Sequence, residues 1–481
     1  MLWLSLHFPH LALEVFARAV ADPALPLLVS DAHGARQRVH ARNRAAAAAG
    51  VRPGMALGAA QALLQDHRTL PRDETAERAA LERLAAWAGQ FTSTVSLVPP
   101  QGLLLEIGGS LMLFGGLEAL RARVLEGTEA LGYHAATGMA PVPLAAVLLA
   151  RAGQDAPVLE KSALHAVLGD FPLEHLGLGE AQTAALHGMG LRRLSDCLRL
   201  PRSGLARRLG PDTLAYLLRI LGELPDPRPA YVPPPRFASR LVLPAEVDNT
   251  EALLFAARRQ LLELGGFLRA RGAGVSQLVL ALGHRGRAPS RLELGLLSPS
   301  RDAGHLFTLL HTRLEQFTLS APVDELVLTA EGLSPLAEEE PPLFDARPRV
   351  QARGEQLLEK LRVRLGAEAV HGCDVVAEHR PERAWRRCAP GSAVKAAAAA
   401  TIFGRRPLWL LDTPEPLEEV DGQPCRGGKL HLLSGPERIE AGWWNAGISR
   451  DYFVAEDSRH ARLWIFREHR QRRWFLHGVF S

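Results

Sequence analysis

Cysteine is scarce in this chain of 481 residues: the only four, with no CxxC pair among them, are Cys197, Cys373, Cys388 and Cys425. A disulfide framework and a thiol redox centre are therefore excluded. Long hydrophobic runs are also absent, since no apolar stretch approaches the roughly 18–20 residues that span a bilayer. The opening segment lacks the basic n-region and cleavage site of a signal peptide. We therefore predict a cytoplasmic protein with no membrane partner.

Glycine and proline are too few for a low-complexity or fibrous chain, with 43 and 34 residues respectively. At roughly 150 residues per domain, the length suggests three or four domains with hydrophobic cores of their own. The sequence thus describes a multidomain globular protein.

Positive charge is concentrated in the middle of the chain, although the net charge is only +4. Residues 191–320 hold 19 arginines, no lysine and 11 acidic residues. The planar guanidinium fork matches phosphate oxygens, so nucleic acid is the first partner to consider. Solvated helix faces in an arginine-rich background would give the same count, and charge alone leaves both interpretations open.

The first 160 residues alternate strand-like and helix-like segments and predict an α/β domain. Residues 161–224 read as short helices punctuated by glycine, with Gly188 and Gly190 between two amphipathic stretches and Arg192 and Arg193 following. This pattern is typical of a helix-hairpin-helix unit, whose backbone N–H groups bind a phosphate. The alternative is a tight turn between helices with no ligand.

Residues 225–236 are dense in proline and predict an extended linker. The segment 237–335 that follows gives the order βαββαβ, with both helices on one face of a four-stranded sheet. Arginines lie on or beside its strands, and side chains there could grip a duplex backbone without reading bases. They are Arg240, Arg285, Arg287 and Arg291.

Residues 336–350 are acidic, and from residue 351 to 481 the composition changes again. Six of the eight tryptophans lie in this tail: Trp385, Trp409, Trp443, Trp444, Trp464 and Trp474. Short antiparallel strands are expected there. The tryptophans could anchor a partner or fill the core of a small β domain.

This order of parts resembles the Y-family translesion DNA polymerases, which implies a palm over 1–160 with fingers inserted at about 12–75. It also implies a thumb over 161–224 and a little finger over 237–335. The segment LHFPHLALEVF at 6–16 stands where that family has (V/I)DxDxF(F/Y)AxVE, so His7 and Pro9 replace two metal-binding acids. Ala12 then replaces the sugar-discriminating aromatic residue.

Two further motifs of the family are also altered. The segment SLVPPQGLLLEI matches SxDEAYLD and places Gln101 and Gly102 where the catalytic Asp-Glu pair belongs. In the fingers, Arg44 and Ala47 replace the Tyr and Arg that hold the incoming triphosphate, and Val147 replaces the expected Lys. The resemblance therefore implies a nucleotide site without its usual ligands.

Nucleotidyl transfer uses two divalent cations held by ionised carboxylates. Residues 1–13 and 91–105 contain no carboxylate, and the nearest acids are Glu14 and Glu106. We therefore predict a protein without a catalytic centre, metal or cofactor. The main alternative is an active polymerase with a metal site rebuilt from Glu14 and Glu106. A third is a DNA-binding repair protein that acts without a polymerase partner.

A Y-family region with these departures and a long C-terminal extension is similar to the ImuB branch of the family. That resemblance implies a non-catalytic adaptor in SOS-induced translesion synthesis, mutagenesis and DNA repair. Its implied partners are damaged primer-template DNA, the sliding clamp, the RecA-like protein ImuA and an error-prone C-family DNA polymerase. Clamp-binding segments resemble QLxLF. The nearest match ends in Leu343 and Phe344, and an ordinary linker is the alternative.

Overall fold

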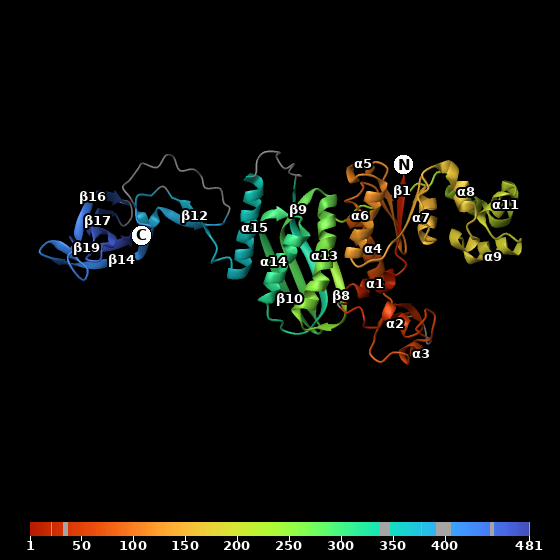
Figure 1. The fold of residues 1–481 in the computed structure, drawn as a ribbon, viewed down its shortest axis with the longest axis horizontal. Coiled ribbons are helices and arrows are strands. Elements are labelled where there is room, and N and C mark those ends of the chain that lie inside the picture. Colours follow the sequence, from red (N-terminus) through yellow and green to blue (C-terminus); the bar gives the residue numbers. More distant parts are fainter. Residues whose placement is uncertain are drawn as a thin grey trace. The chain divides into compact units, whose positions relative to one another are not determined.

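The computed structural model describes residues 1–20, 22–31, 37–336, 347–376, 378–390, 406–442 and 447–480, with side chains in helix α15 described from Gly354 onward. The chain forms two compact units, Met1–Arg364 and Leu365–Ser481. Figure 1 shows its elements coloured along the sequence. In the part of the chain described, no helix has the length and apolar character needed to cross a membrane.

A four-stranded antiparallel sheet in the order β5-β6-β1-β7 forms the centre of the predicted palm. Its strands are β1 (Trp3–His7), β5 (Val95–Val98), β6 (Gly102–Glu106) and β7 (Ala136–Ala140), and its helices are α4 (Glu74–Ala88), α5 (Leu111–Phe114), α6 (Leu117–Ala130) and α7 (Pro143–Arg151). Leu4 and Leu6 pack into a core with α4 and α6, whereas Trp3 belongs to a second core with α7. Both faces of β1 are therefore buried from Trp3 to Leu6, and the buried residues include the polar Ser5.

The predicted fingers form a three-stranded sheet in the order β3-β2-β4, reached through helix α1 (Leu11–Ala17). The remaining elements are β2 (Leu27–Ser30), β3 (Val39–Arg42), α2 (Arg44–Ala48), α3 (Leu57–Gln61) and β4 (Arg68–Pro71). The Asn43 side chain caps α2 by accepting from the Ala46 N–H, and it also bonds the backbone of Leu25 and Leu27. One amide side chain thereby fixes α2 against β2.

Short helices follow the palm, as predicted for residues 161–224. They are α8 (Leu164–Gly169), α9 (Glu180–Gly188), α10 (Leu194–Leu198), α11 (Arg202–Leu209) and α12 (Pro211–Ile220). Their leucines share one core with α7 of the palm. The proline-rich segment then runs along the palm, where the Tyr231 N–H donates to the Val95 carbonyl at 2.7 Å.

The order βαββαβ predicted for residues 237–335 is confirmed. The elements are β8 (Phe237–Val247), α13 (Thr250–Ala270), β9 (Ala273–His284), β10 (Arg287–Ser300), α14 (Ala303–Glu315) and β11 (Val323–Pro335), and the sheet order is β10-β9-β11-β8. Alternate strand residues such as Leu278, Leu280 and Leu282 pack into one core with both helices. The opposite face of the sheet is left without a helical cover in this domain (Figure 1).

Helix α15 (Arg347–Leu365) packs on this little-finger domain, and the first compact unit extends to Arg364. The sequence instead predicted that the C-terminal region begins at residue 351. The difference arises because Glu355 and Glu359 of α15 form hydrogen bonds with the little finger. The composition of the helix does not predict those contacts.

The C-terminal unit contains a six-stranded antiparallel sheet in the order β15-β14-β19-β18-β17-β16 and a β12-β13 hairpin. The strands are β12 (Gly372–Val375), β13 (Trp385–Cys388), β14 (Trp409–Val420), β15 (Gln423–Cys425), β16 (His431–Ala441), β17 (Ile448–Glu456), β18 (Arg462–Glu468) and β19 (Trp474–Val479). Trp464 and Trp474 are buried in its cores, whereas Trp409 is exposed. The expected β-containing tail is confirmed, and two of its tryptophans serve that domain's own packing.

Candidate functional site

Four of the predicted palm positions converge on one pocket of about 230 Å³, which His7, Gln101, Gly102 and Val147 line. His7 pairs with Gly102 across the β1-β6 ladder, and the Phe8 N–H donates to the Gln101 carbonyl at 2.8 Å. The register of the β1-β6 ladder therefore holds the residues at two of the family's acid positions side by side. We call this cavity the palm pocket.

The two other palm positions lie outside the residues that line this pocket. Pro9 sits in the exposed turn between β1 and α1, and Ala12 is buried in α1. A proline ring offers no metal ligand, and a buried methyl group offers no contact to a sugar.

Sequence reasoning missed Arg151, which also lines the palm pocket. It follows Val147 by four residues on α7, so the helical repeat brings both side chains to the same side. Burial, followed by the charge of Arg151, lowers the pKa of His7. The palm pocket thus holds a neutral imidazole and a guanidinium.

Neither of the two nearest acids reaches the palm pocket. Glu106 pairs with Trp3 at the far end of the β1-β6 ladder, about 14 Å along the strands from the His7 position at ~3.4 Å per residue. Its Oε1 accepts from the backbone N–H groups of Leu2 at 3.1 Å and Gly108 at 3.2 Å. Glu106 therefore caps a turn and does not face His7.

Glu14 lines a different cavity of about 530 Å³, together with Arg42, Arg44, Ala47 and Arg259. This cavity, the finger hollow, contains the predicted triphosphate positions of the fingers. Burial raises the pKa of Glu14 to about 7, although its carboxylate accepts from the His134 N–H at 3.0 Å. A partly protonated acid surrounded by arginines is a poor cation ligand.

The residues present do not fit a two-cation centre. The palm pocket supplies one imidazole and no carboxylate, and a guanidinium lies where positive charge would repel a metal ion. Across the described residues, no cluster of three or more His, Cys, Asp or Glu side chains is arranged to hold a metal.

The uncovered face of the little-finger sheet carries a transverse row of residues with an arginine at each end. Arg240 pairs with Val327, Val327 with Ala281, and Ala281 with Arg291. At ~4.8 Å between neighbouring strands, the Cα atoms of Arg240 and Arg291 lie about 14 Å apart. Strand alternation exposes both guanidinium groups on this face, with small apolar residues between them.

The other two predicted arginines lie at the edge of this face. Arg285 follows β9 and lines a hollow of about 410 Å³ with Arg240 and Glu325. Glu325 also forms an ion pair with Arg240 and holds that guanidinium beside β11. Arg287 donates to the Ser320 carbonyl at 3.2 Å. The sequence thus placed all four arginines on one domain but did not reveal these partners.

The glycine hairpin between α9 and α10 has its backbone N–H groups already paired. The Gly190 N–H donates to His187 at 2.9 Å, and those of Arg192 and Arg193 both donate to one oxygen of Asp196 at 3.0 Å. Gly190 adopts a φ of 81°, which explains the need for glycine there. Gly188 ends α9 with an open space beside its Cα.

Any phosphate contact at this hairpin must therefore be made by side chains. Arg193 pairs with Asp170 at 2.8 Å, whereas the Arg192 side chain is exposed. The sequence did not predict that Asp196 would accept hydrogen bonds from these backbone N–H groups. A carboxylate three residues after Arg193 is equally consistent with a solvent-exposed helix face.

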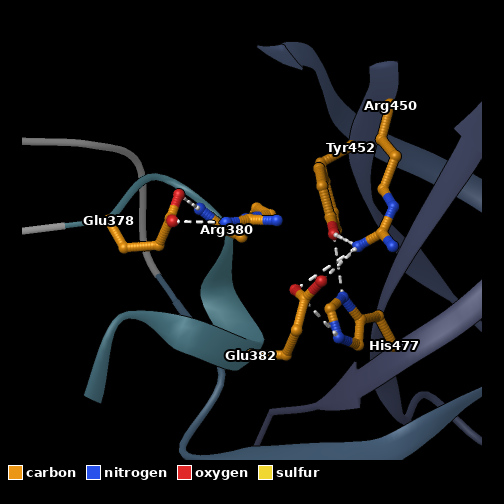
Figure 2. Close-up of polar contacts among 6 residues, drawn as sticks. All are labelled: Glu378, Arg380, Glu382, Arg450, Tyr452 and His477. Carbon is orange, nitrogen blue, oxygen red and sulfur yellow. Dashed lines mark hydrogen bonds and ion pairs between the residues drawn. The ribbon is translucent and has the colours of Figure 1, made fainter. Parts of the chain in front are cut away.

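A cluster of polar side chains lies inside the C-terminal unit (Figure 2). Tyr452 and His477 share a hydrogen bond of 2.8 Å, and Arg450 bonds both Glu382 at 3.1 Å and the Tyr452 hydroxyl at 3.2 Å. Burial lowers the pKa of His477 to about 4 and raises that of Tyr452 to about 12. Neither group titrates near neutral pH, so we interpret the cluster as a structural link between residues 378–383 and the sheet.

The predicted clamp-binding residues Leu343 and Phe344 lie outside the described residues. Trp443 and Trp444 of the tail do so as well. Their assignment rests on the sequence.

Comparison with known proteins gives a consistent set of similarities. The impB/mucB/samB family model matches residues 17–151. Protein ImuB from two strains of Caulobacter vibrioides is 30% identical over 461 residues, covering 90% of this chain and 100% of the relative. Among solved structures, DinB from Sulfolobus solfataricus is 15% identical and covers 70% of this chain and 100% of its own, with a TM-score of 0.39. The insertion ternary complex of Dbh DNA polymerase is 14% identical and covers 69% and 98%, with a TM-score of 0.40.

Proposed function

Because this chain belongs to the ImuB family of Y-family polymerase homologues, we propose that it is a non-catalytic, DNA-binding adaptor of SOS-induced translesion synthesis and mutagenesis. The observation that carries the proposal is the palm pocket, where His7, Gln101 and Gly102 stand at positions of metal-binding acids and Arg151 adds a positive charge. The little finger meanwhile keeps an arginine-lined face suited to a phosphate backbone. Synthesis would then belong to a partner that this protein positions.

We expect no product in a primer-extension assay with the purified full chain, Mg²⁺ or Mn²⁺ and all four deoxynucleoside triphosphates. The reason is that one neutral imidazole cannot hold the two cations that align primer hydroxyl and triphosphate. A variant with His7→Ala and Arg151→Ala serves as the matched control, and any trace signal should be equal in both preparations. Template-dependent product that disappears in the variant would show that the palm is active.

DNA binding is proposed for the uncovered face of the little-finger sheet. The separation of about 14 Å between the positions of Arg240 and Arg291 is comparable with the roughly 12 Å width of the major groove. The two guanidinium groups can therefore contact phosphates on both sides of a groove while small residues between them allow close approach. Arg192 of the thumb would add a further phosphate contact.

Replacing Arg240 and Arg291 together with alanine should weaken binding of a primer-template duplex about tenfold, and equally for unrelated sequences. The slope of log K against log salt should become shallower by about 2, because each lost phosphate contact changes it by roughly 0.9. Arg313→Ala is the control, since this exposed arginine lies on α14, which covers the other face of the sheet. An unchanged slope in the double variant would contradict DNA binding by this face.

The protein partners are proposed from family membership and from the sequence. Leu343 and Phe344 would insert into the hydrophobic pocket of the sliding clamp. ImuA and an error-prone C-family polymerase would bind the C-terminal region, whose unit is a folded β domain with Trp409 exposed. We propose a cytoplasmic location for this assembly.

A further inference from the structure

Helix α15 contacts the little finger through acidic side chains. One carboxylate oxygen of Glu359 accepts from the Leu297 N–H at 2.6 Å, and the other lies 2.5 Å from His305 Nε2. Glu355 accepts from the Ser298 hydroxyl at 2.8 Å. Glu359 and His305 are both buried, so this polar contact is part of the interior.

The outer side of the same helix carries leucines. Leu357, Leu361 and Leu365 are 58%, 36% and 59% exposed. Their spacing of four residues places them in one line over about two turns, or roughly 12 Å at 1.5 Å per residue. We call these three residues the leucine stripe.

The apolar residues of α15 are divided between two sides, because Val363 packs against the little-finger core whereas the leucine stripe faces outward. A helix packed on one domain normally turns its apolar stripe inward and its charges outward. Here two acids are desolvated at the inner face, where hydrogen bonds compensate them, and the leucines remain in water. Packing on the little finger alone gives no reason for the leucine stripe, whereas a further layer on the outer side does.

Charge beside the leucine stripe has one sign. Lys360 and Arg364 are exposed and follow Leu357 and Leu361 by three residues, so they lie along the edge of the stripe. Glu355 and Glu359, by contrast, face the little finger. A partner with acidic residues beside its apolar positions would therefore complement this surface.

We propose that the leucine stripe docks an amphipathic helix of a protein partner, with leucine-type residues at i and i+4 and Asp or Glu along its flanks. Such helices bury an apolar line between them and fix their orientation through the flanking charges. A second copy of this chain fits less well, because α15 paired with α15 brings Lys360 and Arg364 towards another set of cations. The proposal does not depend on whether the palm is inactive.

The test uses two fluorescent synthetic helical peptides with identical leucine repeats, one flanked by glutamate and the other by lysine. In an anisotropy titration of the full chain, we expect the glutamate peptide to bind at least tenfold more tightly, with the difference shrinking at high salt. Leu357→Ser with Leu361→Ser should weaken glutamate-peptide binding at least tenfold. Leu159→Ser is the matched control, because Leu159 is also 58% exposed but lies far from α15 in the sequence.

Charge reversal gives a second readout. Lys360→Glu with Arg364→Glu should transfer the preference to the lysine peptide while circular dichroism and thermal unfolding stay unchanged, since both side chains are exposed. Equal binding of the two peptides, or no binding of the glutamate peptide, would overturn the proposal. The proposal would also be overturned if light scattering detected a dimer of the full chain that dissociates in the serine variants. The partner on the leucine stripe would then be a second copy of the chain.

Discussion

Replacing Glu263 with glutamine should lower the free energy of unfolding by about 3–5 kcal/mol, because it leaves a buried arginine without its counter-charge. Glu263 lies on α13 of the little finger and Arg18 follows α1 of the palm, and both side chains are 1% exposed. They form a direct ion pair. The variant keeps the shape of the side chain, so the experiment measures the charge.

The surroundings of this pair explain why the expected effect is large. Arg83 of α4 lies 3.4 Å from Glu263, the Ser239 hydroxyl donates to it at 2.7 Å, and Arg18 donates to the Tyr133 hydroxyl at 2.5 Å. Burial alone would favour the neutral acid, but the charges of Arg18 and Arg83 hold the pKa of Glu263 below its usual value. The carboxylate is therefore ionised and neutralises the buried Arg18, with Arg83 as a second, partly exposed counter-charge.

Chemical denaturation of the full chain at neutral pH measures the change, with Glu251→Gln as the control because Glu251 is exposed on the same helix. The pH dependence has a defined sign. A depressed pKa adds stability above the ordinary value of 4.5, and that stability is lost as the pH falls through the lower folded-state value. In Glu263→Gln, the free energy of unfolding should lack this decrease at acid pH. If the substitution lowered the free energy of unfolding by less than about 1 kcal/mol at neutral pH, water would have to reach the pair.

The βαββαβ order of the little finger could be predicted because its periods of two and about 3.6 residues are local properties of the sequence. The convergence of His7, Gln101 and Val147 could be predicted from family motifs. Arg151 could also have been found, since its spacing from Val147 is one helical turn. The spacing is a local signal, but Arg151 lies at none of the family motif positions named above.

Glu263 and α15 show what a sequence does not reveal. Glu263 reads as a solvated charge on an amphipathic helix, and its partner Arg18 lies 245 residues away. Residues 351–365 belong to the region where we expected short strands, but they continue helix α15, and Glu355 and Glu359 of that helix contact the little finger. Pairings across domains depend on three-dimensional complementarity, for which no local pattern exists.

Gly266→Ala should lower the free energy of unfolding by about 2–3 kcal/mol, although alanine is the better helix former. A Cβ at Gly266 of α13 would lie 2.1 Å from Cδ1 of Trp87 and 2.7 Å from the Gln90 amide nitrogen. Trp87 has no room to retreat, because on its other side a Cβ at Gly127 of α6 would lie 2.4 Å from the ring. The indole thus fills the space between two glycines on helices of different domains.

The neighbouring glycine supplies the control for this prediction. A Cβ at Gly265 meets nothing nearer than 3.5 Å, so Gly265→Ala should raise the free energy of unfolding by about 0.5–1 kcal/mol through helix propensity alone. Urea titrations of both variants, followed by tryptophan fluorescence, measure the two changes in the free energy of unfolding. We expect these changes to have opposite signs at the two adjacent positions. If both substitutions stabilised the chain, the contact between α13 and Trp87 would be loose, and the tight packing of the indole between the two helices would be contradicted.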